Sequence, residues 1–275
     1  MSRQIQEIRN GRKHGPVTSY VTSANFSDLN PFVLWDHFHI PHVQGKAGFG
    51  FHGHSGVATI SYPQIGAIAH EDTGGHSGLL KAGGIQIMSA GSGVLHKETV
   101  HPDRFLADAF QLWVALPAKE LEMGPVTYST QQQDDIAVVE EDHATTKVLI
   151  GRYKEVQSLV QAPVDMTYLH VHLKAEARWQ HLASELQTTA FIYVRRGSVA
   201  VGNAILSSGE LGVFEKNYKL INVTADGQLA EFLIISGTPL DQELISNGPS
   251  VHSNLANLNA GAQRIKQLQL QGVSR

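Results

Sequence analysis

Short β-prone runs separated by glycine, proline or asparagine make up the chain from Pro16 onward. This rhythm is typical of a β-sandwich or β-barrel, whereas a parallel α/β fold alternates its strands with long helical segments. The chain contains 26 glycines and only 17% charged residues, and many tight turns between short strands account for both values. The pattern therefore predicts an all-β fold.

Two sets of predicted strands divide the chain, whose 275 residues are enough for two β domains of similar size. The first set comprises residues 18–22, 33–38, 57–62, 67–70, 85–89, 94–98 and 110–116. The second set comprises residues 147–151, 167–173, 190–195, 198–201, 212–214, 219–223 and 230–236. Residues 117–145 are more polar and are expected to connect the domains, which we place at residues 1–135 and 136–275.

Two glycine-containing turns indicate that the two domains repeat one another. Residues 82–84 read Ala-Gly-Gly, residues 208–210 read Ser-Gly-Glu, and each turn precedes a predicted strand. A repeat this short carries weight only together with other similarities between the halves. It is consistent with an internal duplication of one domain.

The end of the chain has a different period. Apolar residues recur there at spacings of three or four, as on one face of an α-helix. They are Leu255, Leu258, Ala262, Ile265 and Leu268. Ser253 or Asn254 is suited to cap the N-terminus of such a helix. We expect an amphipathic helix between residues 253 and 270 that docks on one of the β domains.

Two short motifs each place metal-ligating side chains two residues apart. FHGHSG contains His52 and His54, and GVLHKET contains His96 and Glu98. Residues i and i+2 of a strand project to the same face, so the members of each pair are expected to point together. His96 follows His54 by 42 residues, which leaves room for about three short strands that bring the pairs face to face. Three imidazoles and one carboxylate suit Zn, Fe, Cu, Ni or Mn and leave a coordination position open.

Other histidines lack a matching pair. His170 and His172 form another His-x-His in TYLHVHL, but no second pair follows at a comparable distance. They are predicted to belong to an ordinary strand face. His70 occurs singly and is predicted to be structural or solvated. In FVLWDHF, Asp36 and His37 are candidates to receive a hydrogen bond from the second ring nitrogen of a ligating histidine.

Composition excludes several other chemistries. The chain has no cysteine, which excludes disulfides, thiolate zinc sites and cysteine nucleophiles. A formal net charge of −4 gives no basic surface for nucleic acid or for an anionic membrane. The sequence contains no signal-peptide run, no long apolar segment, and no GxSxG, P-loop or GxGxxG motif. A cytoplasmic protein without nucleic-acid or membrane partners is therefore expected.

The motifs together resemble the pirin family, in the bicupin branch of the cupin superfamily. The resemblance runs in the same order along nearly the whole chain and is most specific around the two metal-ligand motifs. The matching stretches are PFVLWDHF (31–38), FHGHSGVATISY (51–62), AHEDTGGHSG (69–78), GGIQIMSAGSGVLHKE (83–98), FQLWVALPAKE (110–120), AFIYVRRGSVAVG (190–202) and the segment from FLIISGTPLDQEL to NGPSVHSN (232–254).

The resemblance implies an all-β fold of two cupin-type β-barrels with a C-terminal helix. Its implied N-terminal barrel, within residues 1–135, holds one divalent transition metal through the residues that match the family's ligands, His52, His54, His96 and Glu98. Iron is the expected metal, and Cu, Ni, Co, Mn and Zn are the alternatives. The C-terminal barrel and the helix, within residues 136–275, are implied to lack a metal.

Two functions follow from this resemblance. The first is a quercetin 2,3-dioxygenase-like oxidoreductase that opens a flavonol-like substrate with O2, with Glu98 both as ligand and as the catalytic base. The alternative is a non-enzymatic iron-binding regulatory protein that acts through protein partners. A metal-free cupin isomerase ranks last, because it would have no use for four ligands.

The chain departs from the family pattern beside its ligands. Gly53 stands where proline is frequent, and Ser55, Gly56 and Val57 replace the usual arginine and large apolar residue. The ligands themselves are intact. We therefore expect an altered pocket, and the substrate cannot be copied from another pirin.

Overall fold

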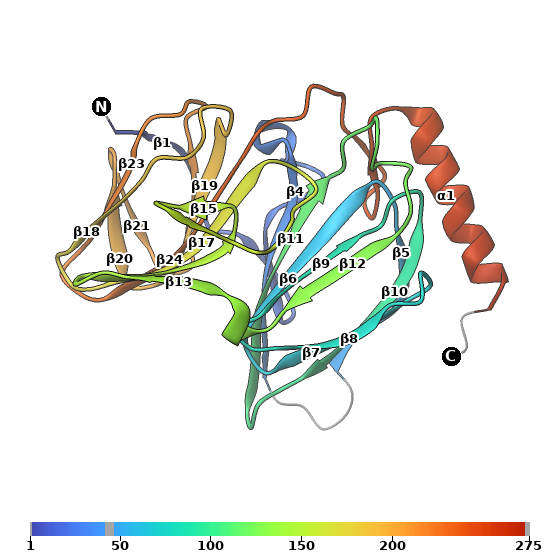
Figure 1. Ribbon diagram of the computed structural model, residues 1–275, viewed down its shortest axis with the longest axis horizontal. Coiled ribbons are helices and arrows are strands. Elements are labelled where there is room, and N and C mark those ends of the chain that lie inside the picture. The colour runs from blue at the N-terminus through green and yellow to red at the C-terminus, as the bar shows by residue number, and fades with distance from the viewer. Residues whose placement is uncertain (1, 42–46, 273–275) are drawn as a thin grey trace. The chain divides into compact units, whose positions relative to one another are not determined.

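The computed structural model describes residues 2–41 and 47–272 (Figure 1). Over these residues the named strands pair antiparallel, and the chain forms one α-helix and two short 3-10 turns, η1 (Ser27–Leu29) and η2 (Gln133–Asp135). No helix within the described ranges combines the length and the hydrophobicity that a membrane span requires.

The chain divides into two compact units. Residues 13–135 and 240–272 form the unit that we name the first barrel. Residues 2–12 and 136–239 form the second barrel. The N-terminal residues 2–12 therefore belong to the second barrel, and the C-terminal residues 240–272 belong to the first.

Two antiparallel sheets form the first barrel. Its strands are β2 (Arg12–His14), β3 (Val17–Val21), β4 (Phe32–Pro41), β5 (Ala47–His54), β6 (Val57–Ile65), β7 (Ala67–Asp72), β8 (Ser77–Lys81), β9 (Ile85–Ser89), β10 (Val94–His101), β11 (Leu106–Ala115) and β12 (Thr127–Gln131). The strand orders are β12-β9-β6-β11-β4-β3-β2 and β5-β10-β7-β8. A small pair, β25 (Ile245–Ser246) and β26 (Val251–His252), precedes the helix.

The second barrel repeats this plan. Its strands are β1 (Ile5–Arg9), β13 (Ala137–Glu140), β14 (Ala144–Ile150), β15 (Arg152–Tyr153), β16 (Val156–Gln157), β17 (Met166–Leu173), β18 (Arg178–His181), β19 (Thr189–Arg196), β20 (Ser198–Val201), β21 (Ala204–Ser207), β22 (Leu211–Phe214), β23 (Ile221–Ala225) and β24 (Ala230–Gly237). The larger sheet has the order β1-β22-β19-β24-β17-β14-β13, and the smaller has the order β18-β23-β20-β21. A separate pair, β15 and β16, completes the unit.

The two barrels correspond strand by strand. The order β9-β6-β11-β4-β3 in the first matches β22-β19-β24-β17-β14 in the second, and β5-β10-β7-β8 matches β18-β23-β20-β21. The two turns singled out in the sequence lie in equivalent places, just before β9 and just before β22. Gly83 and Gly209 take φ values of 82° and 86° there, a region that favours glycine. The predicted repeat is therefore present in the topology.

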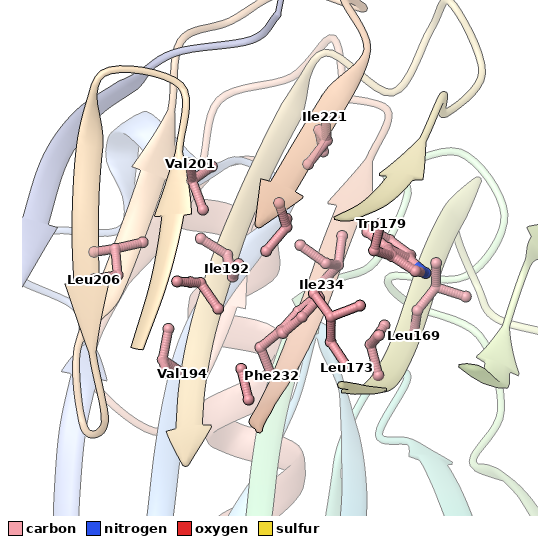
Figure 2. Close-up of a cluster of buried hydrophobic side chains, with 14 of the residues drawn as sticks. Leu169, Leu173, Trp179, Ile192, Val194, Val201, Leu206, Ile221, Phe232 and Ile234 are labelled. Atoms are coloured by element: carbon pink, nitrogen blue, oxygen red, sulfur yellow. The ribbon is translucent and has the colours of Figure 1, made fainter. Parts of the chain in front are cut away.

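Alternate residues of the strands fill the second barrel with a buried apolar cluster, part of which is drawn in Figure 2. Trp179 and Phe232 pack edge to face in it, with ring centroids 5.5 Å apart. The indole N–H of Trp179 donates to the hydroxyl of Thr146 at 3.0 Å, so this buried polar group is satisfied. The interior of the second barrel is thus a packed core.

The helix α1 (Leu255–Leu270) belongs to the first barrel and contacts β5 and β10 (Figure 1). Asn254 caps it as predicted, because its side chain accepts a hydrogen bond from the backbone N–H of Asn257. Leu258 and Leu268 are buried, whereas Leu255 is 61% exposed. The buried face is therefore narrower than the spacing of apolar residues predicts.

The predicted all-β fold with one C-terminal helix is confirmed, and a strand overlaps each predicted run. The motif at His52 and His54 was expected on a strand and lies at the end of β5, whereas the remaining strands, which are short, were not indicated by the sequence pattern. The predicted domain limits differ from the observed units at both ends, because β1 pairs with β22 and α1 packs on β5 and β10. Pairing between segments so distant in sequence leaves no local signal.

Candidate metal centre

Strands β5 and β10 are neighbours and bring three histidines together. In the antiparallel register His52 lies opposite His96, and His54 lies opposite Val94. One ring nitrogen from each of His52, His54 and His96 lies within 4.8 Å of the others. The spacing of two residues on each strand places these side chains on one face, as the sequence predicted.

Two of these imidazoles are oriented by backbone carbonyls. Nδ1 of His52 lies 2.7 Å from the carbonyl oxygen of Gly50, and Nδ1 of His54 lies 2.7 Å from that of Pro249. A carbonyl oxygen can only accept, so Nδ1 of each ring donates and Nε2 is the nitrogen left to face a metal. Nε2 of His54 has no hydrogen-bond partner among the described residues. This is the tautomer that a metal-binding histidine requires.

His96 is only 1% exposed, and neither of its ring nitrogens has a partner in the described part of the chain. A buried polar group without a partner costs about 1–3 kcal/mol. Burial, together with the neighbouring His54 and His52, holds the pKa of His96 far below its ordinary value. Burial likewise lowers the pKa of His54 to about 4. Both imidazoles therefore stay neutral at physiological pH, and a cation would satisfy their free lone pairs.

Glu98 is buried and held by two side chains. The hydroxyl of Ser61 donates to one carboxylate oxygen at 3.1 Å, and the amide of Gln111 donates to the other at 3.0 Å. The indole N–H of Trp113 donates to the carbonyl oxygen of Gln111 at 3.2 Å, which fixes the amide. A carboxylate oxygen of Glu98, one ring nitrogen of His96 and one ring nitrogen of His70 lie within 4.8 Å of one another. This second group shares only His96 with the group of three histidines.

A β-bulge next to the site shapes β5. The register passes from His52 opposite His96 to Phe49 opposite Glu98, so β5 has one residue more than β10 in this interval. Gly48 has a φ of 135°, and a Cβ there would lie 2.2 Å from the backbone oxygen of Glu98. Bulges of this kind re-aim side chains next to functional sites.

His52, His54 and Glu98 border a pocket of about 430 Å³ in the first barrel, which is in the usual size range for small-molecule sites. Its walls are largely apolar and include Leu34, Phe38, Phe49 and Trp113, the last packed edge to face on His54 at 4.6 Å. The pocket can therefore accommodate a small, mostly apolar ligand.

Asp36 and His37, the two candidates for orienting a ligand, point to opposite faces of β4. Asp36 lines the pocket, and burial raises its pKa to about 6, a rise that the Ser19 hydrogen bond reduces. Nε2 of His37 lies 3.0 Å from Asp108, and its ring stacks on Phe110. Neither residue has a hydrogen bond to a ligand histidine, because the carbonyls of Gly50 and Pro249 fill that role.

The residues that depart from the family pattern lie beneath the C-terminal segment. A Cβ at Gly53 would lie 2.4 Å from the Cγ2 of Ile265 in α1, and one at Gly56 would lie 1.9 Å from the backbone oxygen of Val251. Ser55 faces Gly261, where a Cβ would come within 2.2 Å of the Ser55 hydroxyl. Small residues at these positions allow the close approach of the helix.

A buried hydrogen-bonded chain anchors the same segment. The hydroxyl of Ser55 lies 2.9 Å from Nε2 of His252, whose Nδ1 lies 2.7 Å from Glu122. The order hydroxyl, imidazole, carboxylate is that of a serine hydrolase, but all three residues are at most 1% exposed. No substrate reaches a serine buried in this way, so the chain is structural. It fixes the segment whose Pro249 carbonyl orients His54.

The second barrel has other side chains at most of the positions of the candidate ligands. In the first barrel His54, the last residue of β5, pairs with Val94, the first residue of β10. In the second barrel His181, the last residue of β18, pairs with Ile221, the first residue of β23. With this alignment the counterparts of His52, His96 and Glu98 are Trp179, Val223 and Ala225, all within the apolar core. Only His181 keeps a ligating side chain.

His170 and His172 have a different environment from the first-barrel histidines. Glu231 on β24 joins them, a carboxylate that the sequence pattern missed because it stands alone on a distant strand. Its oxygen lies 2.9 Å from His170 and 2.7 Å from the guanidinium of Arg195. Burial alone would raise the pKa of Glu231, but the neighbouring His170 and Arg195 outweigh burial and lower the pKa to about 2. The carboxylate is therefore already paired with a cation.

Two barrels of this strand order, with histidines on adjacent strands inside one of them, define a bicupin. Sequence comparison places this protein in the pirin family: the Pirin profile matches residues 14–114 and the Pirin C-terminal cupin domain matches residues 168–267. A Pseudomonas aeruginosa relative, provisionally named a quercetin 2,3-dioxygenase, is 32% identical over 238 residues that cover 82% of this chain and 81% of the relative.

Solved structures share the fold. A quercetin 2,3-dioxygenase from Acinetobacter baumannii superposes with a TM-score of 0.90 at 23% identity, and the match covers 100% of both chains. A bacterial pirin from Escherichia coli, described in complex with nickel(II), superposes with a TM-score of 0.65 at 22% identity over 87% of this chain and 99% of that one. At these identities the likeness concerns the fold.

Proposed function

We propose that the protein is a metal-dependent dioxygenase that opens a flavonol-like substrate with O2 in the first barrel. The observation that carries the proposal is the convergence of three imidazoles, two of them buried and held neutral, beside a largely apolar pocket of about 430 Å³. The names of the Pseudomonas relative and of the Acinetobacter structure support the substrate class.

The proposed ligands are His52, His54, His96 and Glu98, and they hold one divalent transition metal. Iron is our first choice, with Cu, Ni, Co, Mn and Zn as alternatives, because a set of three nitrogens and one oxygen accepts all of these ions. The unpartnered lone pairs of His54 and His96 fit such an ion. When bound, the metal supplies Lewis acidity toward a substrate oxygen and redox contact with O2.

Glu98 is the proposed general base. Its carboxylate borders the pocket, and Ser61 and Gln111 hold both oxygens where a substrate hydroxyl can approach. Removal of the hydroxyl proton leaves an electron-rich substrate anion, which is the form that reacts with O2. Leu34, Phe38 and Trp113 line the same pocket and keep water away from that anion.

The test is oxygen consumption with quercetin. Protein loaded separately with Fe, Cu, Ni, Co or Mn is mixed with quercetin in air, and the flavonol absorbance and dissolved O2 are followed together. We expect both to fall in parallel for at least one metal. If a fully loaded protein consumes neither, the enzymatic proposal fails and the metal-dependent interaction protein becomes the better explanation.

A further inference from the structure

The three metal-site histidines differ in how they are oriented. His52 and His54 each donate from Nδ1 to a backbone carbonyl. Within the described residues His96 has no such acceptor, although at 1% exposure it is the most buried of the three. A metal-bound histidine almost always donates its other N–H to a carbonyl, a carboxylate or water. Once one nitrogen of His96 binds an ion, the other carries a proton that needs an acceptor.

His70 lies beside His96, with ring centroids 5.5 Å apart, and has a ring nitrogen without a partner in the described residues. One ring nitrogen of His70, one of His96 and a carboxylate oxygen of Glu98 all lie within 4.8 Å of one another. The side chain of His70 is fully buried, and its Nδ1 has no partner among residues 2–41 and 47–272. Both oxygens of Glu98 already accept hydrogen bonds from other side chains. The lone pair on Nδ1 of His70 is therefore unused.

The surroundings of His70 fix both its ring and its proton. Nε2 lies 2.9 Å from a carboxylate oxygen of Asp72, and the ring stacks on Tyr128 with centroids 4.8 Å apart. The other oxygen of Asp72 accepts from the backbone N–H groups of Gly74 and His76. A carboxylate held in this way is an acceptor, so Nε2 of His70 donates to Asp72 and Nδ1 is the nitrogen left for another contact.

We propose that His70 is a positioning residue for the metal ligand His96. In this arrangement Asp72 accepts from His70, His70 accepts from His96, and His96 keeps its remaining lone pair for the metal. The inference rests on the metal role proposed above. It assigns a function to a histidine that the sequence pattern treated as an isolated residue.

The second barrel supports a link between the pair His70 and Asp72 and the proposed metal ligands. In β7 and β10, His70 lies opposite Glu98 and Asp72 lies opposite His96. The equivalent pairs in β20 and β23 are Val199 with Ala225 and Val201 with Val223, all four of them apolar core residues. His70 and Asp72 thus occur in the barrel that has the ligands, and both are replaced by valine in the barrel that lacks them.

Two variants separate the acceptor from the other contacts of His70. His70→Leu and His70→Asn both lose the hydrogen bond to Asp72 and the ring that stacks on Tyr128, but only asparagine keeps an acceptor near the position of Nδ1. We expect the Zn²⁺ affinity, measured by competition with a chromophoric chelator, to fall about 10- to 100-fold in His70→Leu. His70→Asn should retain an affinity close to that of the unaltered chain. Equal affinities in all three proteins, or equal losses in both variants, would overturn the proposal.

A control variant and a spectroscopic readout test the direction of the hydrogen bonds. His39→Gln alters a histidine of the same barrel that contacts Asp108, outside the proposed chain, and should leave Zn²⁺ affinity unchanged. In the Zn²⁺-loaded protein, nitrogen-detected NMR of the histidine side chains should show His70 protonated on Nε2, with an unprotonated Nδ1 that accepts a hydrogen bond. A proton on Nδ1 of His70 would contradict the proposed chain.

Metal stoichiometry distinguishes failure of this inference from failure of the proposed function. An unaltered chain that binds no Zn²⁺ or other transition metal would defeat the proposed function and this inference with it. One equivalent of Zn²⁺, bound equally tightly by His70→Leu, would defeat the inference alone. Two equivalents, one of them lost in His70→Leu, would make His70 a ligand of a second ion and would overturn the positioning role.

Discussion

The two barrels share a strand order but use their interiors in opposite ways. In the second barrel the positions that correspond to His52, His96 and Glu98 carry Trp179, Val223 and Ala225, and the interior is packed. In the first barrel the same positions carry polar side chains, and several buried nitrogens lack partners among the described residues. The topology therefore does not require a site. A few inward-facing residues on two adjacent strands decide whether a barrel is a core or a binding pocket.

The C-terminal helix marks a second difference between the barrels. It covers β5 and β10, and the preceding segment supplies the Pro249 carbonyl that orients His54. Gly53, Ser55 and Gly56 depart from the usual family residues at the points where this segment approaches. The departures therefore concern the docking of the helix, and none of these three residues lines the pocket.

The largest expected effect is loss of the metal from the first barrel. His52→Ala combined with His96→Ala removes two of the three imidazoles, and metal content by elemental analysis should fall to background, a loss of affinity of about 100-fold or more. The matched variant in the second barrel, His172→Ala, should retain full metal content. Unchanged metal in the double variant would place the ion elsewhere and remove the contrast between the barrels.

The next effect concerns turnover. Glu98→Gln keeps a side chain of the same size and a carbonyl oxygen for the metal, but it cannot take a proton at neutral pH. We expect turnover of quercetin to fall by about 100-fold or more, the usual contribution of a general base, while metal content is retained. Glu71→Gln, an exposed carboxylate paired with Lys97 on the neighbouring strand, is the control and should keep full activity. Full activity in Glu98→Gln would remove the base role.

A smaller effect tests the helix. Gly53→Ala places a Cβ 2.4 Å from Ile265 in the structure as it stands, and overpacking of this kind costs up to about 3 kcal/mol. Hydrogen exchange should show α1 losing protection while the second barrel keeps its own. Adding Ile265→Ala should restore protection because it removes the colliding methyl group. If the double variant were no better protected than Gly53→Ala, close packing at this point would not be what holds the helix.

Much of this architecture follows from local pattern. The apolar period of β6, β11 and β24 and the cap at Asn254 need no tertiary information. The spacing of two residues also indicated that His52 and His54 point together, and the structure places them beside His96. His70 and Asp72 share that spacing, but a His-x-Asp pair gives a weaker signal than His-x-His. The local pattern does not encode strand pairing or the path of the loops. These decide the position of Glu231 beside His170, the barrel to which each chain end belongs, and the contacts of the Gly50 and Pro249 carbonyls with the histidines.

The smallest effect follows His181, the counterpart of His54 in the second barrel. Burial lowers the pKa of His181 to about 4, so the folded chain excludes a proton that the unfolded chain, with a histidine pKa of about 6.5, accepts. Between pH 6.5 and pH 4 this residue should lower the free energy of unfolding by about 1.4 kcal/mol for each pH unit of acidification, and above pH 6.5 it should have no such effect. His181→Leu should remove that contribution, which urea unfolding of the metal-free protein at pH 7 and pH 5.5 measures as a difference of about 1 kcal/mol. An identical pH dependence in both proteins would mean that His181 is protonated in the fold, and the second barrel would then hold a charge in its apolar interior.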